Sequence, residues 1–158
     1  MFQPEIKMVE PMTVAFALKT GPYSQIPEGY GQLYGWIAMH GLTPSQGGMP
    51  MAVYLTHPDE VPESEAVWEL WAPLAGDPAP LEADDDGLGV KRLEAGLVAS
   101  AMHRGPYETL GSTYGELAGW VASQGYHMTG PPYEAYLTGP DTPSEEHLTE
   151  ICFPVAKD

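Results

Sequence analysis

The chain of 158 residues is long enough for one domain or for two small halves that share a core. It has 6 basic and 22 acidic residues, a formal net charge of −16, which disfavours nucleic acids and anionic membranes as partners. No segment approaches the roughly 18–20 apolar residues of a spanning helix, and the N-terminus lacks the apolar run of a signal peptide. We therefore expect a soluble, cytoplasmic protein.

The first half of the chain has the pattern strand, helix, strand, strand. An extended run at 13–18 precedes a Gly-Pro-Tyr turn at 21–23, because the residue before proline is pushed out of helical conformation. Apolar residues spaced as i, i+4, i+7 and i+11 then predict a helix over 26–37. Two short strands are expected at 51–56 and 66–73.

The second half repeats this pattern about 84 residues later. An extended run at 97–102 leads into a second Gly-Pro-Tyr turn at 105–107, and the same helical stripe follows over 110–121. Two closing strands are expected at 133–138 and 148–153. The elements of the first half therefore recur in the same order.

Matching motifs predict that the chain is one domain built by tandem duplication of 1–74 and 90–158. Gly35-Trp36 recurs as Gly119-Trp120, for example. The acidic stretch 75–89 is rich in proline and glycine and is expected to be an exposed linker. Two such units predict an α+β fold, with antiparallel strands in one layer and helices in another.

Glycines inside the first predicted helix are unfavourable, since each costs about 0.5–1 kcal/mol relative to alanine. Gly29, Gly31 and Gly35 all fall within it. We expect close packing of the helix to explain these glycines, and direct ligand contact is the alternative.

Alternation of side chains sorts the closing strands of each half into two faces. One face is consistently apolar and is expected to lie under the helix: Met51, Val53, Leu55, Leu70 and Ala72 in the first half, and Tyr133, Ala135, Leu137, Ile151 and Phe153 in the second. The other face carries rings and carboxylates: Ala52, Tyr54, Glu69 and Trp71, and then Glu134, Tyr136, Glu150 and Cys152. The duplication is expected to join these second faces as a concave ligand cleft between the halves.

Aromatic rings beside carboxylates form a receptor for flat apolar cations, because the rings supply stacking and cation–π attraction and a carboxylate supplies the countercharge. A merely solvated face is the alternative. The candidate ligand-binding residues, with the helix residue Trp120 included, are Tyr54, Glu69, Trp71, Trp120, Glu134, Tyr136 and Glu150.

No cofactor and no metal is predicted. No glycine-rich phosphate loop follows a strand, and no Gly-x-Ser-x-Gly elbow occurs. The single cysteine, Cys152, excludes an internal disulfide and a cysteine-rich zinc site, and we expect it to be a small buried hydrophobe.

The paired GPY turns, the Tyr-Gly-x-Leu-x-Gly-Trp helices, the PPYEAYLTGPD segment and the closing LTEICFPV resemble the GyrI-like small-molecule-binding family. This family also forms the effector-binding domain of multidrug-responsive regulators of the AraC and MerR types. The resemblance implies a duplicated strand-helix-strand-strand (SHS2-type) module with a ligand cleft between its halves. It also implies a buried glutamate that holds lipophilic cations, and this role falls on Glu134 or Glu150.

Regulators of this kind have a helix-turn-helix domain ahead of the sensor, whereas the first strand is expected here within a few residues of Met1. The resemblance therefore indicates a stand-alone protein that sequesters or senses lipophilic, cationic or aromatic small molecules. One alternative is a hydrolase of cyclopropane-bearing DNA-alkylating compounds, with a glutamate and a tyrosine as catalytic residues: Glu134, Glu150, Tyr136 and Tyr133. A second alternative is a gyrase-inhibitor-like protein that binds a protein partner through the acidic stretch 82–86.

Overall fold

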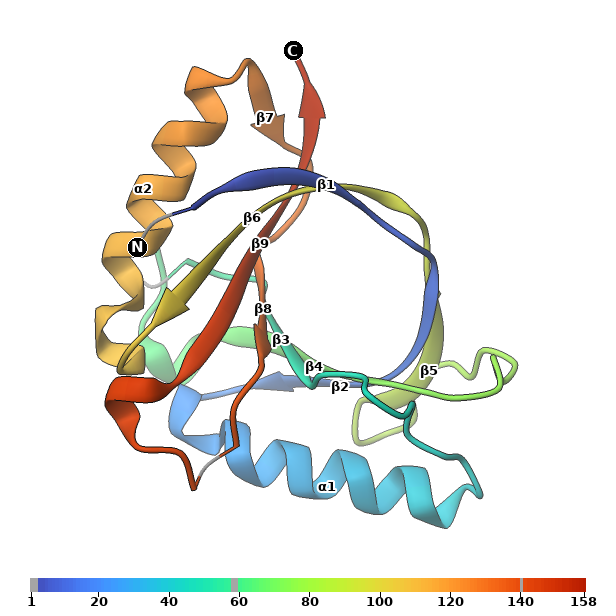
Figure 1. Cartoon of the computed structure of the whole chain (residues 1–158). Coiled ribbons are helices and arrows are strands. Elements are labelled where there is room, and N and C mark those ends of the chain that lie inside the picture. The colour runs from blue at the N-terminus through green and yellow to red at the C-terminus, as the bar shows by residue number, and fades with distance from the viewer. Residues whose placement is uncertain (1–2, 58–59, 140) are drawn as a thin grey trace. The chain divides into compact units, whose positions relative to one another are not determined.

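A computed structural model describes residues 3–57, 60–139 and 141–158 (Figure 1). The chain divides into two compact units, one formed by Pro11–Glu94 and the other by the N-terminal segment up to Glu10 together with Ala95–Asp158. The described residues form two α-helices and nine β-strands, which confirms the predicted α+β class.

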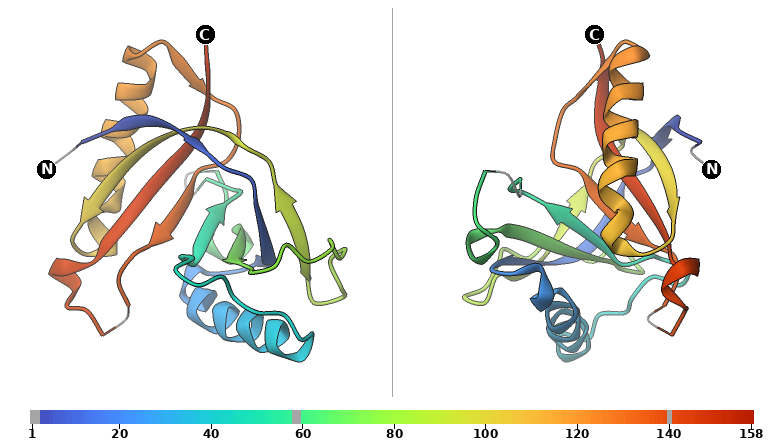
Figure 2. Two further views of the ribbon diagram at one scale, coloured as in Figure 1. Left: turned by 45° about the vertical axis from the view of Figure 1, so that its right-hand side comes forward. Right: turned by 90° about the vertical axis from the view of Figure 1, so that its left-hand side faces the viewer.

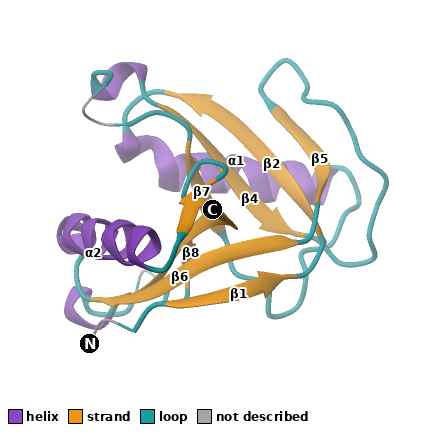
Figure 3. Ribbon diagram, turned by 90° about the horizontal axis from the view of Figure 1, so that it is seen from above, coloured by secondary structure: helices purple, strands orange, loops and turns teal. Residues whose placement is uncertain are grey.

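The Pro11–Glu94 unit is an antiparallel sheet with one helix on one of its faces. Helix α1 (Ile26–Met39) runs along β2 and β4 (Figure 3) and ends where Gly41 adopts a left-handed φ of 67°. The core between helix and sheet is formed by Leu33, Ile37, Trp68, Leu70, Leu88 and Val90. The spatial order of the strands is β3 (Met51–Tyr54), β4 (Val67–Pro73), β2 (Met12–Thr20) and β5 (Leu88–Leu93).

The second unit has the same plan. Helix α2 (Leu110–Ser123) lies along β6 (Figure 2), and its buried residues pack with those of β6 and β9 in one hydrophobic cluster. Strand β7 (Tyr126–Met128) pairs with the end of β9. The spatial order of the other strands is β1 (Glu5–Val9), β6 (Gly96–Arg104), β9 (Leu148–Lys157) and β8 (Tyr133–Tyr136). Short 3-10 helices lie at Tyr23–Gln25, Glu63–Glu65, Tyr107–Thr109 and Ser144–Glu146.

The two helices and the strands next to them confirm the sequence prediction. Three strands, β1, β5 and β7, were not predicted. Strand β1 alternates charged and apolar residues over only four positions, residues 5–8, and strand β5 shows no alternation. Strand β5 begins at Leu88, so the last two residues of the expected linker are strand residues. Strand β1 pairs with β6, and β5 pairs with β2.

The predicted sorting of faces is wrong for one strand in each unit. In β4 and β9 the apolar residues face the helix as predicted. Their neighbours β3 and β8 are reversed, because Val53 lies opposite Glu69 and Glu134 lies opposite Ile151, and directly opposed residues share a face. A one-residue difference in register exchanges every side chain between faces. Consequently Glu134 and Tyr136 lie on the helix side of the sheet, whereas Glu150 and Cys152 lie on the other side.

The glycines of α1 differ in their surroundings. A Cβ on Gly29 would lie 2.8 Å from Leu70 Cδ1, which confirms the expected close packing. For Gly31 and Gly35 no atom of the described residues outside the helix's own backbone lies within 4 Å of the Cβ position. Close packing therefore does not explain why glycine stands at these two positions.

This difference predicts opposite effects of alanine substitution in α1. Gly35→Ala is expected to raise the free energy of unfolding by about 0.5–1 kcal/mol, because alanine loses less backbone entropy in a helix and meets no neighbour. Gly29→Ala is expected to lower it, since Leu70 must move. Urea unfolding measures both, and equal changes in the two variants would contradict the packing described here.

Candidate functional site

A buried carboxylate lies between strand β8 and helix α2. Glu134 is 4% exposed, and the Tyr114 hydroxyl of α2 donates a hydrogen bond to its Oε2 at 2.5 Å. The Tyr136 hydroxyl donates to the other oxygen at 2.8 Å. Residues 134 and 136 share one face of β8 because side chains alternate along a strand. The protein therefore fixes this carboxylate with phenol hydroxyls from a helix and a strand.

Further rings extend this cluster outwards from Glu134. Tyr107 packs edge-on against Tyr136, with ring centroids 5.9 Å apart, and stacks on His147 at 4.8 Å. Its side chain is 45% exposed. Burial and the negative charge of Glu134 raise the pKa of the Tyr107 phenol. The electrostatic field of the buried carboxylate thus reaches a ring that solvent also reaches.

Three polar atoms next to this cluster lack hydrogen bonds. His147 Nδ1 and Nε2 and Thr149 Oγ1 are buried and have no partner among the described residues. Thr149 lies directly opposite Tyr136 in the sheet. An unsatisfied buried polar atom costs roughly 1–3 kcal/mol, so native proteins contain few of them. These atoms are consistent with a place where a ligand or water supplies the missing bonds.

Glu150 lies on the opposite face of the same sheet and is paired within the chain. Lys7 of β1 forms an ion pair with it, and the Ser100 hydroxyl donates to Oε2 at 2.5 Å. Burial would lower the pKa of Lys7, but the hydrogen bond to Glu150 and its charge raise it. A cationic ligand would therefore meet a carboxylate that an ammonium group already neutralises.

Glu69 repeats this arrangement in the other unit. Lys91 of β5 forms an ion pair with it, and Trp71 Nε1 donates to Oε1 at 2.6 Å. The Lys91 ammonium also lies 4.9 Å from the Phe16 ring centroid and 5.6 Å from that of Trp71. The aromatic and acidic groups predicted to bind a cation are thus brought together here around a cation of the chain itself.

The remaining predicted site residues have other surroundings. Tyr54 packs edge-on against Tyr23 at 5.4 Å on the helix side of its sheet. Trp120 packs against the hydrophobic cluster of its own unit. Tyr133 lies opposite Cys152, and burial, followed by Cys152 and Glu150, raises the pKa of its phenol. Asp84 of the acidic stretch accepts hydrogen bonds within the fold. The one from the Leu88 N–H is the main cause that lowers the pKa of its carboxyl group.

Cys152 is buried, as predicted, and is expected to react slowly. Burial, followed by the charge of Glu150, raises the pKa of its thiol from 9.0 to about 12. The thiolate is the nucleophile, so alkylation of the folded protein at pH 8 should be about a thousandfold slower than that of an ordinary thiol and should quicken as the pH rises towards 12. Iodoacetamide labelling followed by mass spectrometry measures this rate. Labelling as fast as in urea would contradict the burial.

Sequence reasoning missed several residues of these clusters. Tyr114 is the i+4 residue of the apolar stripe predicted over 110–121, and the stripe alone does not indicate that its hydroxyl has a partner. Lys7 and Lys91 are 84 positions apart, the offset of the repeat, and this was the available signal for two equivalent Lys–Glu pairs.

A family model of the GyrI-like small-molecule-binding domain matches residues 2–156. The chain belongs to this family. The C-terminal domain of EcmrR is similar in structure to this GyrI-like chain, with 25% identity, a TM-score of 0.81 and 99% of each chain covered. EcmrR in complex with DNA also matches, with 23% identity, a TM-score of 0.84 and 99% of this chain covered. The chain spans 58% of the length of that EcmrR chain.

Two other structures share the fold of this GyrI-like domain. A hydrolase from Listeria innocua has 16% identity and a TM-score of 0.74, with 98% of this chain and 92% of that chain covered. SAV2435, solved bound to tetraphenylphosphonium, has 17% identity and a TM-score of 0.62, with 98% and 94% covered. Comparison with curated proteins finds no match. Neither α1 nor α2, the two α-helices of the described residues, has the length and apolar character needed to cross a membrane.

Proposed function

We propose that this GyrI-like domain binds lipophilic small molecules with a cationic, aromatic structure, and that Glu134 supplies the countercharge. The observation that supports this most strongly is the buried Glu134 carboxylate, held by Tyr114 and Tyr136, whose field reaches the exposed Tyr107 ring. A carboxylate away from water attracts a cation more strongly than a solvated one, because the effective dielectric constant is lower.

The aromatic rings around Glu134 supply the rest of the receptor. The exposed part of the Tyr107 ring, which is not covered by His147 or Tyr136, offers stacking area and cation–π attraction for a flat ligand. The unsatisfied atoms of His147 and Thr149 add polar groups that a ligand or a bound water would satisfy. Glu150 and Glu69 suit this role less well, because Lys7 and Lys91 already neutralise them.

Titration with tetraphenylphosphonium and rhodamine-type dyes tests the proposed binding. These cations are expected to bind with dissociation constants in the micromolar range, about −8 kcal/mol. Benzoate-type anions of similar size serve as the control and should bind much more weakly. If a diverse panel of lipophilic cations fails to bind the folded protein, the proposal is wrong.

The hydrogen bond between Tyr136 and Glu134 also supports a second candidate, hydrolysis of a strained cyclopropane in a DNA-alkylating compound. The Glu134 carboxylate would take a proton from water while the water oxygen bonds to a ring carbon. The ring carbon–carbon bond would break, and its electron pair would pass to the conjugated carbonyl, which is then protonated. Tyr136 and Tyr114 would position the carboxylate.

A further inference from the structure

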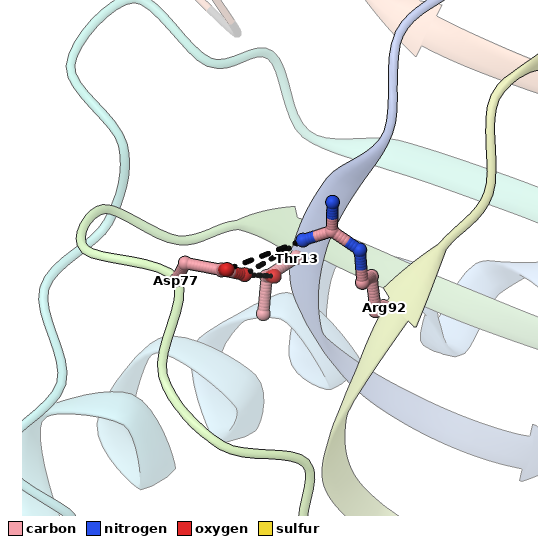
Figure 4. A network of polar contacts seen from close by, with 3 residues as sticks. All are labelled: Thr13, Asp77 and Arg92. Atoms are coloured by element: carbon pink, nitrogen blue, oxygen red, sulfur yellow. Dashed lines mark hydrogen bonds and ion pairs between the residues drawn. The ribbon is translucent and has the colours of Figure 1, made fainter.

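A pocket of about 260 Å³ lies in the Pro11–Glu94 unit and plays no part in the function proposed above. Its polar wall consists of Thr13 at the start of β2, Arg92 in β5 and Asp77 in the loop after β4 (Figure 4). Met12, Leu74 and two prolines supply its apolar wall. The segment after α1 contributes Ser45 to the pocket lining, and the Ser45 N–H donates to the Pro73 carbonyl at 2.8 Å.

The polar wall is a built network rather than a chance surface contact. Arg92 NH1 donates to both oxygens of Asp77, at 3.1 and 3.2 Å, and the Thr13 hydroxyl donates to Oδ1. Thr13 is 5% exposed. Asp77 adopts a left-handed backbone with φ of 48°, a conformation that aspartate adopts more readily than most residues other than glycine.

The equivalent position of the other unit shows that the fold does not require these charges. Thr13 pairs with Arg92 in the β2–β5 register, and Leu97 pairs with Met8 in the β6–β1 register. Thr13 corresponds to Leu97 and Arg92 to Met8, each 84 positions apart, the offset of the repeat. Leucine and methionine therefore serve structurally where the Pro11–Glu94 unit has threonine and arginine.

Although Arg92 and Asp77 pair with each other, both remain accessible to a ligand, because their side chains are much more exposed than the lysine-paired carboxylates of Glu69 and Glu150. A guanidinium has five N–H donors, and Figure 4 shows the outer nitrogen of Arg92 directed away from Asp77. The side chains of Arg92 and Asp77 are 47% and 67% exposed. A ligand carboxylate on Arg92 would also lie near the negative charge of Asp77, and an ammonium group on the same ligand would offset that repulsion.

We propose that this pocket binds a small zwitterion of the α-amino-acid type with an apolar side chain. The ligand carboxylate pairs with Arg92, its ammonium group with Asp77, and its side chain lies against the apolar residues that line the pocket. Among ligands that carry a carboxylate, a zwitterion is repelled less than an anion by a chain with a net charge of −16.

Titration followed by amide NMR tests this site, with phenylalanine, N-acetylphenylalanine and phenylalaninamide as probes. Phenylalanine should shift the amide signals of Thr13 and Ser45, and each single-charge analogue should bind at least about tenfold more weakly, because one charged hydrogen bond is lost. Undetectable phenylalanine binding would overturn the proposal. Equal binding of N-acetylphenylalanine would overturn it too, because the site would then be a plain anion site.

Two variants and a control complete the test. Arg92→Met copies the residue of the other unit, so it should fold, and it should weaken phenylalanine binding at least about tenfold. Asp77→Asn, which tolerates the left-handed backbone, should weaken phenylalanine and strengthen N-acetylphenylalanine. Arg104→Met removes an exposed arginine at the end of β6 and should change the binding of neither phenylalanine nor N-acetylphenylalanine. Equal phenylalanine affinities in Arg92→Met and Arg104→Met would overturn the proposal. Tetraphenylphosphonium binding tests the Glu134 site separately and should be unaffected by Arg92→Met.

Discussion

Replacing Trp68 by alanine is expected to lower the free energy of unfolding by about 3–5 kcal/mol, the range for large aromatic side chains removed from a core. Trp68 is 1% exposed and packs beside Gly29 of α1. Its indole Nε1 also donates a hydrogen bond to the Gly21 carbonyl at 2.9 Å, so the Gly-Pro-Tyr turn loses a buried partner at the same time.

Urea unfolding of Trp68→Ala measures this loss, with Met39→Ala as the control. Met39 is the last residue of α1 and is 86% exposed. Removing its side chain should therefore change the free energy of unfolding by no more than about 0.5 kcal/mol. A loss below about 1 kcal/mol in Trp68→Ala would show that the helix does not pack on β4 as described.

The second large effect concerns the hydrolytic alternative, in which Glu134→Gln is expected to slow water addition to a cyclopropane-bearing alkylating compound by about 10²–10⁴-fold. Glutamine keeps the shape of the side chain; its carbonyl oxygen can accept from one of the two tyrosines, and its NH2 group can donate to the hydroxyl oxygen of the other. It cannot take a proton from water at neutral pH. Chromatographic detection of the ring-opened product measures the rate.

Glu150→Gln is the matched control for hydrolysis, because Glu150 is on the opposite face of the sheet and is paired with Lys7. Its rate should stay close to that of the wild type. Equal rates in the wild type and in both variants would show that neither carboxylate is a general base, and would leave binding as the function.

The helices and the strands that pack on them could be predicted because their apolar residues are periodic. Leu33 and Ile37 are buried in α1, as the stripe predicts, and Gly41 ends the helix. The relative register of β3 and β4, and of β8 and β9, could not be predicted, because it depends on connections of irregular length between the strands. Tyr54 and Tyr136 suit either face of a sheet, so alternation within each strand, without the register between strands, placed them on the wrong face.

The same limit explains what the sequence could indicate about the candidate site. The structure does bring carboxylates and aromatic rings together at Glu134 and at Glu69, and their role in ligand binding stays a prediction. Which carboxylate has a lysine beside it depends on the pairing of β1 with β6 and of β5 with β2, and the sequence analysis did not predict β1 or β5 as strands. The proposal of Glu134 rather than Glu150 therefore rests on contacts that the sequence analysis did not predict.

Tetraphenylphosphonium titration of the wild type, Glu134→Gln and Glu150→Gln tests most directly whether Glu134 is the carboxylate that binds the cation. Glu134→Gln is expected to weaken binding at least about tenfold, because the ligand charge loses its buried partner. Glu150→Gln is expected to leave the dissociation constant nearly unchanged, since Glu150 is paired with Lys7. Unchanged binding in Glu134→Gln, together with a loss in Glu150→Gln, would contradict the assignment.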